Sequence, residues 1–128
     1  MTPSFAMKTA AQSASASASD PAKARELSAA LDLLWTRFLP EIRQRADQLE
    51  DAAAALAANT LSTAQREAAH HVAHNLAGTL GTFNLTRGTE LAREFELLFS
   101  GEVAPANTIA GHLAAIAREL RTIVDSRK

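Results

Sequence analysis

His74 and the two glycines that follow it are the residues whose types and spacing suggest chemistry in this sequence. The glycines lie four and seven positions after the histidine, at Gly78 and Gly81. Because a helix turns by about 100° per residue, a helix would place both glycines on the same side as His74. Glycine lowers helix stability, so its presence at both positions indicates that something must approach the imidazole closely.

The imidazole of His74 is suited to nucleophilic chemistry. Histidine titrates near physiological pH, so part of the ring population is neutral and carries a free lone pair. The neighbouring Ala77 is small, and Thr79 adds a hydroxyl group nearby. The sequence contains no phosphate-binding glycine loop, no Ser/His/Asp set and no nucleotide-binding motif. We therefore expect a partner protein to bring the remaining catalytic groups.

The elements that position these residues are predicted to be helices. The chain of 128 residues is rich in Ala, Leu, Glu and Arg and contains five glycines. This composition predicts an all-α protein with room for one domain. Residues 1–19 are mostly Ala, Ser and Thr without apolar periodicity, so we expect a flexible tail there. Residues 20–128 are then predicted to form a helical bundle domain.

The first two helices are predicted on either side of a proline. Asp20 is a suitable N-cap for an additional N-terminal helix over residues 21–38. Pro40 lacks a backbone donor, so it is expected to interrupt the helical pattern. A second helix would then begin at Glu41.

Three further helices follow at regular intervals. Ser62 and Gln65 form a capping-box pattern at the start of the third, which is expected to extend to about Phe83. The fourth is predicted to begin near Thr86 and the fifth near Asn107. Short connections favour antiparallel neighbours, so helices two to five should form an antiparallel up-down four-helix bundle.

The apolar residues of the third helix predict which way His74 faces. The expected core positions are Ala69, Val72, Leu76, Leu80 and Phe83. His74 lies about 200° around the helix from both Val72 and Leu76. The side chain of His74 is therefore predicted to be exposed, opposite the core.

Charge and composition make several classes of function poor fits. The formal net charge of −1 gives no basic field of the kind that nucleic acid or an anionic membrane would require. The sequence has no cysteine and no apolar run long enough to span a membrane. We expect a cytoplasmic protein that binds neither nucleic acid nor membranes.

The stretch His74-Asn75-Leu76-Ala77-Gly78-Thr79 resembles the motif of the histidine-containing phosphotransfer (HPt) domain. That motif has a histidine, a leucine two positions later, usually a lysine at the third, a glycine at the fourth and then a small hydroxyl residue. The resemblance extends over roughly residues 24–126. It implies a four-helix bundle whose exposed histidine accepts a phosphoryl group from the aspartate of a receiver domain and passes it to another receiver.

The resemblance also implies roles for individual residues. His74 would be the phosphoacceptor, and Gly78 would leave space for the active site of the receiver. Ala77 stands where the family usually has a lysine that helps to neutralise the phosphoryl charge. Glu96 lies 22 positions after His74, where the family has an acidic or amide residue. Glu96 could dock the receiver or orient His74, or it could simply be a solvated helix residue, and the sequence leaves these alternatives open. The residues expected to contact the receiver are His70, Ala77, Gly78, Thr79, Gly81 and Glu96.

Two other features bear on this resemblance. Arg66, Arg87 and Arg93 are cations that can contact an acidic receiver in place of the missing lysine. Asn84 stands where a branch of the family often has glycine, which affects how the third helix ends.

The partners implied are receiver domains of response regulators or of hybrid histidine kinases. The receiver supplies Mg²⁺, a lysine and the carboxylate, so the chain needs no cofactor of its own. No autonomous kinase activity is expected. An exposed transfer site makes no demand for a dimer, and we expect a monomer.

Two alternatives remain open from the sequence. The first is a non-catalytic helical adaptor, either a degenerate HPt-like domain that only docks receivers or an unrelated bundle. The second is a metal-binding helical bundle, because His70 and His74 are four residues apart as in helical zinc pairs. That pair lacks obvious further ligands, since Glu67 lies near only His70 and His71, so no metal site is predicted.

Overall fold

The computed structural model describes residues 20–101 and 105–127, and their regular structure is helical throughout. The elements are α2 (Pro21–Ala57), α3 (Thr63–Thr82), α4 (Thr86–Leu98), the 3₁₀ turn η1 (Asn107–Ile109) and α5 (Ala110–Ser126). The all-α prediction is confirmed. The tail predicted at residues 1–19 lies outside the described residues. Within the described part of the chain, no helix is long and apolar enough to cross a membrane.

Helix α2 corrects the prediction of an additional N-terminal helix. It is continuous from Pro21 to Ala57 and contains Pro40 in its interior. An interior proline removes one backbone hydrogen bond and costs about 3 kcal/mol. The buried side chains of Trp35 before it and Ile42 after it offset that cost, because burial of each contributes a comparable amount. Residues 21–38 and the segment from Glu41 onward are therefore parts of one helix.

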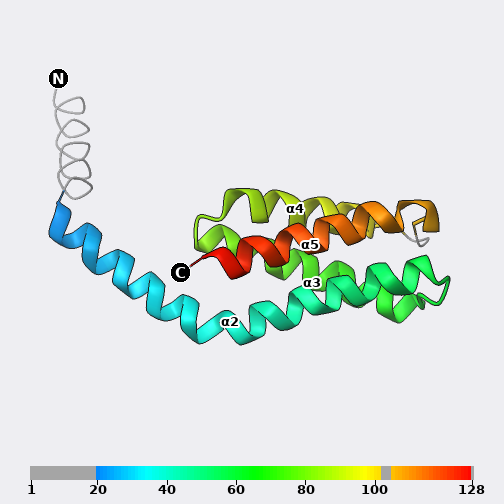
Figure 1. Cartoon of the computed structure of the whole chain (residues 1–128), viewed down its shortest axis with the longest axis horizontal. Helices are drawn as coiled ribbons and strands as arrows, with labels where there is room; N and C mark the ends of the chain where they lie inside the picture. The colour runs from blue at the N-terminus through cyan, green and yellow to red at the C-terminus, as the bar shows by residue number, and fades with distance from the viewer. Residues whose placement is uncertain (1–19, 102–104, 128) are drawn as a thin grey trace, which may run out of the picture. The chain divides into compact units, whose positions relative to one another are not determined.

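The chain divides into two compact units, residues 1–37 and 38–128. In the first unit, the described residues form the N-terminal part of α2, where Leu27 and Leu33 are exposed. The second unit contains the rest of α2 and the other helices, and it holds His74. Its four helical segments are drawn in Figure 1 from cyan-green through to red.

Side-chain pairs establish that neighbouring helices of the second unit are antiparallel. Arg43 pairs with Asp125, and further along α2 Glu50 pairs with Arg121, so α5 runs opposite to α2. Between α4 and α5, Arg87 pairs with Glu119 and Glu94 with His112. The contacts of α3 with α4 follow the same reversal, from Arg66 with Gly101 to Ala77 with Thr89. The predicted antiparallel bundle is confirmed.

The core of this unit is formed by apolar side chains from each of its α-helices. Its largest fully buried side chains are Phe95, Phe99, Ile42, Leu49, Leu76, Leu80, Leu113, Leu120 and Val124. In α3, Val72 is only partly buried, and Ala73 is fully buried beside it. The buried face of α3 is therefore centred slightly differently from the predicted one, and His74 still lies on the outside of the bundle.

A glycine that the sequence did not single out controls the distance between α3 and α4. A Cβ atom placed on Gly88 would lie 2.9 Å from Cδ1 of Leu80, which is too close for an ordinary contact. Leu80 is fully buried, so it has little space to move away. Gly88 thus allows α4 to lie close enough to α3 for their side chains to pair across the exposed edge.

The start of α3 is as predicted. The Ser62 side chain accepts a hydrogen bond from the backbone N–H of Gln65, and the Gln65 side chain accepts one from the backbone N–H of Ser62. This capping box satisfies two backbone donors that the helix itself leaves free. The capping box therefore defines the residue at which α3 begins.

The end of α3 depends on Asn84, which adopts a left-handed conformation with φ of 59°. Asparagine tolerates this region better than other non-glycine residues, and glycine adopts it without strain. We expect Asn84→Gly to maintain or raise stability and Asn84→Ala to lower it by about 1 kcal/mol. Urea denaturation of the two variants measures the difference. If Asn84→Ala is as stable as the wild type, the strain argument is wrong.

Candidate functional site

His74 lies on the exposed face of α3, as predicted. Its side chain is 66% exposed, whereas Ala73 before it is fully buried. Figure 1 shows α3 and α4 along one another, joined by a short turn. The imidazole is therefore accessible to another protein at the edge where these two helices meet.

Glu96 of α4 holds one nitrogen of this imidazole. Its Oε2 lies 2.9 Å from Nδ1 of His74, and its side chain is 22% exposed. An ionised carboxylate can only accept hydrogen bonds, so Nδ1 must carry the proton and donate it. In the neutral ring, Nε2 is then the nitrogen with the free lone pair. The geometry therefore leaves Nε2 as the unpaired ring nitrogen, and it shows that Glu96 contacts the imidazole and is not simply a solvated helix residue.

His70 lies beside the same carboxylate. Its Nε2 is 3.8 Å from Oε2 of Glu96, which is an ion-pair distance and too long for a hydrogen bond. Two imidazoles one turn apart on α3 therefore share one acidic neighbour on α4, and only that of His74 is hydrogen-bonded to it.

The two glycines behind His74 differ in their surroundings. A Cβ atom on Gly78 would have no heavy atom within 4 Å, so the protein's own packing gives no reason for glycine there. A Cβ atom on Gly81 would lie 3.6 Å from Oγ1 of Thr89, an ordinary contact. Both glycines are exposed. Space at Gly78 therefore remains open on the exposed face of α3, one turn after His74.

Ala77 and Thr79 are less accessible than a docking role suggests. Ala77 is only 4% exposed, and its carbonyl oxygen accepts a hydrogen bond of 3.4 Å from Thr89. The Thr79 hydroxyl donates to the carbonyl oxygen of Asn75 at 3.0 Å. Thr79 is also about 140° around the helix from His74, because five residues separate them. The structure brings together His74, Glu96, His70 and the open side of Gly78, and it leaves the Thr79 hydroxyl apart from them.

One exposed apolar residue near this site was not anticipated from the sequence. Leu97 follows Glu96 directly and is 71% exposed, outside the stripe of α4 that Leu91 and Phe95 bury. The position of Leu97 outside that stripe could have indicated from the sequence that its side chain is exposed. A single exposed apolar side chain is common on protein surfaces, so Leu97 alone does not mark a docking surface.

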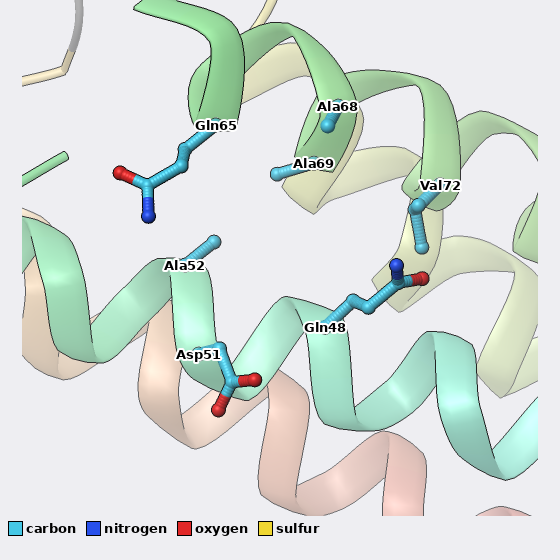
Figure 2. A pocket seen from close by; sticks show the side chains of 7 residues that line it. All are labelled: Gln48, Asp51, Ala52, Gln65, Ala68, Ala69 and Val72. Carbon is cyan, nitrogen blue, oxygen red and sulfur yellow. The ribbon is translucent and has the colours of Figure 1, made fainter. Parts of the chain in front are cut away.

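A hollow of about 170 Å³ lies elsewhere, between α2 and α3. It is lined by Gln48, Asp51, Ala52, Gln65, Ala68, Ala69 and Val72, and Figure 2 shows the two glutamines and the aspartate around small side chains. Pockets for small molecules usually measure about 300–1,000 Å³. Val72 is about 200° around α3 from His74, so this hollow does not belong to the site of His74.

A metal-binding bundle, the second alternative from the sequence, would need several ligating side chains close together. Within residues 20–101 and 105–127, no group of three or more His, Cys, Asp or Glu side chains is arranged to hold a metal ion. His112, the histidine outside α3, pairs instead with Glu94, with 2.5 Å between Nε2 and Oε2.

Comparisons with known proteins identify the family to which the chain belongs. Protein RcaC of Microchaete diplosiphon is 40% identical over 71 residues, which make up 56% of this chain and 11% of RcaC. The chain thus corresponds to a small part of that relative. No solved structure matches it significantly. Residues 33–126, which include His74, Gly78 and Glu96, match the Hpt domain. The chain therefore belongs to the Hpt domain family, whose members are phosphotransfer relay domains and not kinases.

Proposed function

We propose that this protein is a phosphorelay intermediate in which His74 accepts a phosphoryl group from a receiver-domain aspartate and transfers it to another receiver. The observation that carries the proposal is the hydrogen bond from Nδ1 of His74 to Glu96, 2.9 Å long, which leaves an exposed Nε2 with its lone pair. A nucleophile held in one orientation at the surface suits a reaction whose other groups come from a partner.

The transfer step forms and breaks bonds only between the imidazole of His74 and the aspartyl phosphate of the receiver. The Nε2 lone pair attacks the phosphorus of the aspartyl phosphate, the N–P bond forms, and the P–O bond to the aspartate breaks. The aspartate leaves as a carboxylate, and the imidazole ring becomes positively charged. Glu96 stabilises that charge, because its carboxylate already accepts the Nδ1 proton. The reverse sequence at a second receiver returns Nε2 to its lone-pair form.

The partner supplies the charge stabilisation around the phosphoryl group. Phosphoryl transfer depends mainly on positioning and on cations close to the transferred oxygens. In this proposal the receiver contributes Mg²⁺ and a lysine, and Gly78 leaves the space that their approach requires.

Glu96 provides a graded prediction. We expect Glu96→Ala to slow phosphotransfer by about 10- to 30-fold, because Nδ1 loses its acceptor and the ring its orientation. Glu96→Gln should lose less, since an amide oxygen can still accept from Nδ1. Rapid-quench kinetics measure the rates, and nitrogen NMR reports which ring nitrogen carries the proton. A rate and tautomer that are unchanged in Glu96→Ala would show that Glu96 does not orient His74.

The test of the function begins with labelled receivers. Receiver domains encoded in the same genome are phosphorylated with radiolabelled acetyl phosphate and mixed with the wild-type protein. We expect acid-labile, alkali-stable label that mass spectrometry locates at His74. Transfer onward to a second, unlabelled receiver completes the relay. If receivers bind but no label reaches His74 from any of them, the protein is a docking adaptor and the proposal is wrong.

A further inference from the structure

Phosphorylation of His74 would leave a net negative charge at this site even after the positive ring is counted, and Ala77 offers no cation to offset it. A phosphoryl group carries about 1.5 to 2 negative charges at neutral pH. Glu96 adds another negative charge beside the same imidazole ring, at Nδ1 of His74. A positive side chain close to Nε2 would offset the repulsion between these groups.

Two of the three arginine candidates are already engaged. Arg66 is only 8% exposed, and its guanidinium donates to the backbone carbonyl of Gly101. Arg87 donates to Glu119 of α5, with 2.9 Å between Nε and Oε2. This hydrogen bond lowers the pKa of Glu119 and raises the pKa of Arg87. Both side chains are therefore held in contacts away from His74.

Arg93 is exposed and lies on the face of α4 that meets α3. It follows Thr89 by four residues and precedes Glu96 by three, so the three residues share one side of the helix. Thr89 contacts the carbonyl oxygen of Ala77, and Glu96 contacts His74. These two contacts place Arg93 opposite the segment of α3 between His74 and Ala77.

The guanidinium of Arg93 is also available. Among residues 20–101 and 105–127, it makes no hydrogen bond and no ion pair. An exposed arginine has a long, flexible stem and a planar group that can bind two phosphoryl oxygens at once.

We propose that Arg93 binds the phosphoryl oxygens on Nε2 of His74 and so takes the role that a lysine at position 77 would have. The proposal rests on the proposed function, because it assigns a positioning residue to that reaction. Arg93 stabilises phosphohistidine 74 from α4, whereas a lysine at position 77 would do so from α3. It forms and breaks no covalent bond.

The direct test uses the protein without any receiver. Phosphoramidate phosphorylates histidine side chains chemically, and the loss of one phosphorus NMR signal in His74→Gln assigns phosphohistidine 74. A nearby cation favours the doubly charged phosphoryl group and lowers its pKa. We therefore expect that pKa to rise by about half a pH unit in Arg93→Ala and by less in Arg93→Lys. Arg87→Ala, which removes the same charge from the same helix, should leave it unchanged.

A kinetic test follows in the presence of a phosphorylated receiver. Arg93→Ala should slow transfer to His74 by about three- to tenfold, and Arg93→Lys, which keeps the positive charge, should recover most of the loss. Circular dichroism checks that each variant remains folded. An unchanged phosphohistidine titration in Arg93→Ala would overturn the proposal. If the titration responds but the wild type accepts no label from receivers, the role of Arg93 stands and the relay function fails.

Discussion

Replacing His74 with glutamine is expected to abolish phosphotransfer, with no label above background from any receiver. Glutamine keeps a polar side chain of similar length and can still contact Glu96, but its amide nitrogen has no free lone pair to attack phosphorus. His74 is 66% exposed and no core side chain depends on it, so the variant should unfold at the wild-type urea concentration. Gel-based transfer assays and urea denaturation measure the two quantities.

Three other histidines serve as matched controls. His71→Gln and His112→Gln should transfer at the wild-type rate, since His71 is exposed on α3 and His112 is paired with Glu94. His70→Gln should retain label on His74, because only His74 is hydrogen-bonded to Glu96. If the label persists in His74→Gln and disappears in His70→Gln, the phosphoacceptor is His70 and the assignment to His74 is wrong.

Replacing Gly78 with glutamine is expected to slow phosphotransfer by about 100-fold or more while leaving the protein folded. A side chain at this position meets no atom of the protein itself, so it projects into the space beside His74. A misplacement of about 1 Å between reacting groups can cost about 100-fold in rate. Surface plasmon resonance with an immobilised receiver and rapid-quench kinetics separate weaker docking from slower chemistry.

The same position allows stability to be distinguished from function. Gly78→Ala should raise the free energy of unfolding by about 0.5–1 kcal/mol, because alanine favours helix and nothing crowds its Cβ. Gly81→Gln is the matched control one turn further from His74, and we expect a smaller loss there. Wild-type transfer rates in Gly78→Gln would mean that the open space is not used for docking.

Most of the fold was predictable because the helices follow local rules. The capping box at Ser62 and Gln65 and the start of α4 at Thr86 appear as predicted. Pro40 was misjudged because a proline penalty is a local quantity, whereas burial of residues on both sides of it is a property of the packed helix. Gly88 escaped notice for a related reason, since only the distance between α3 and α4 makes its missing Cβ necessary.

Some features of the candidate site were likewise predictable from the sequence, and others were not. Periodicity alone placed His74 opposite the core, and the structure agrees. The family resemblance placed Ala77 among the docking residues, although the approach of α4 buries this side chain. The angle of about 140° between Thr79 and His74 follows from helical geometry and could have separated them at the start.

The sequence by itself determined an all-α fold, the exposure of His74 and the family motif around it, because these depend on spacing within single helices. Only the tertiary structure decided that Glu96 contacts Nδ1, which leaves Nε2 free, and that, of the three arginine candidates, Arg93 makes no hydrogen bond or ion pair within the described residues. Residues 22 positions apart meet only when two helices pack in a particular register. That register comes from the burial of side chains such as Leu80 and Phe95 between the helices, which no local pattern specifies.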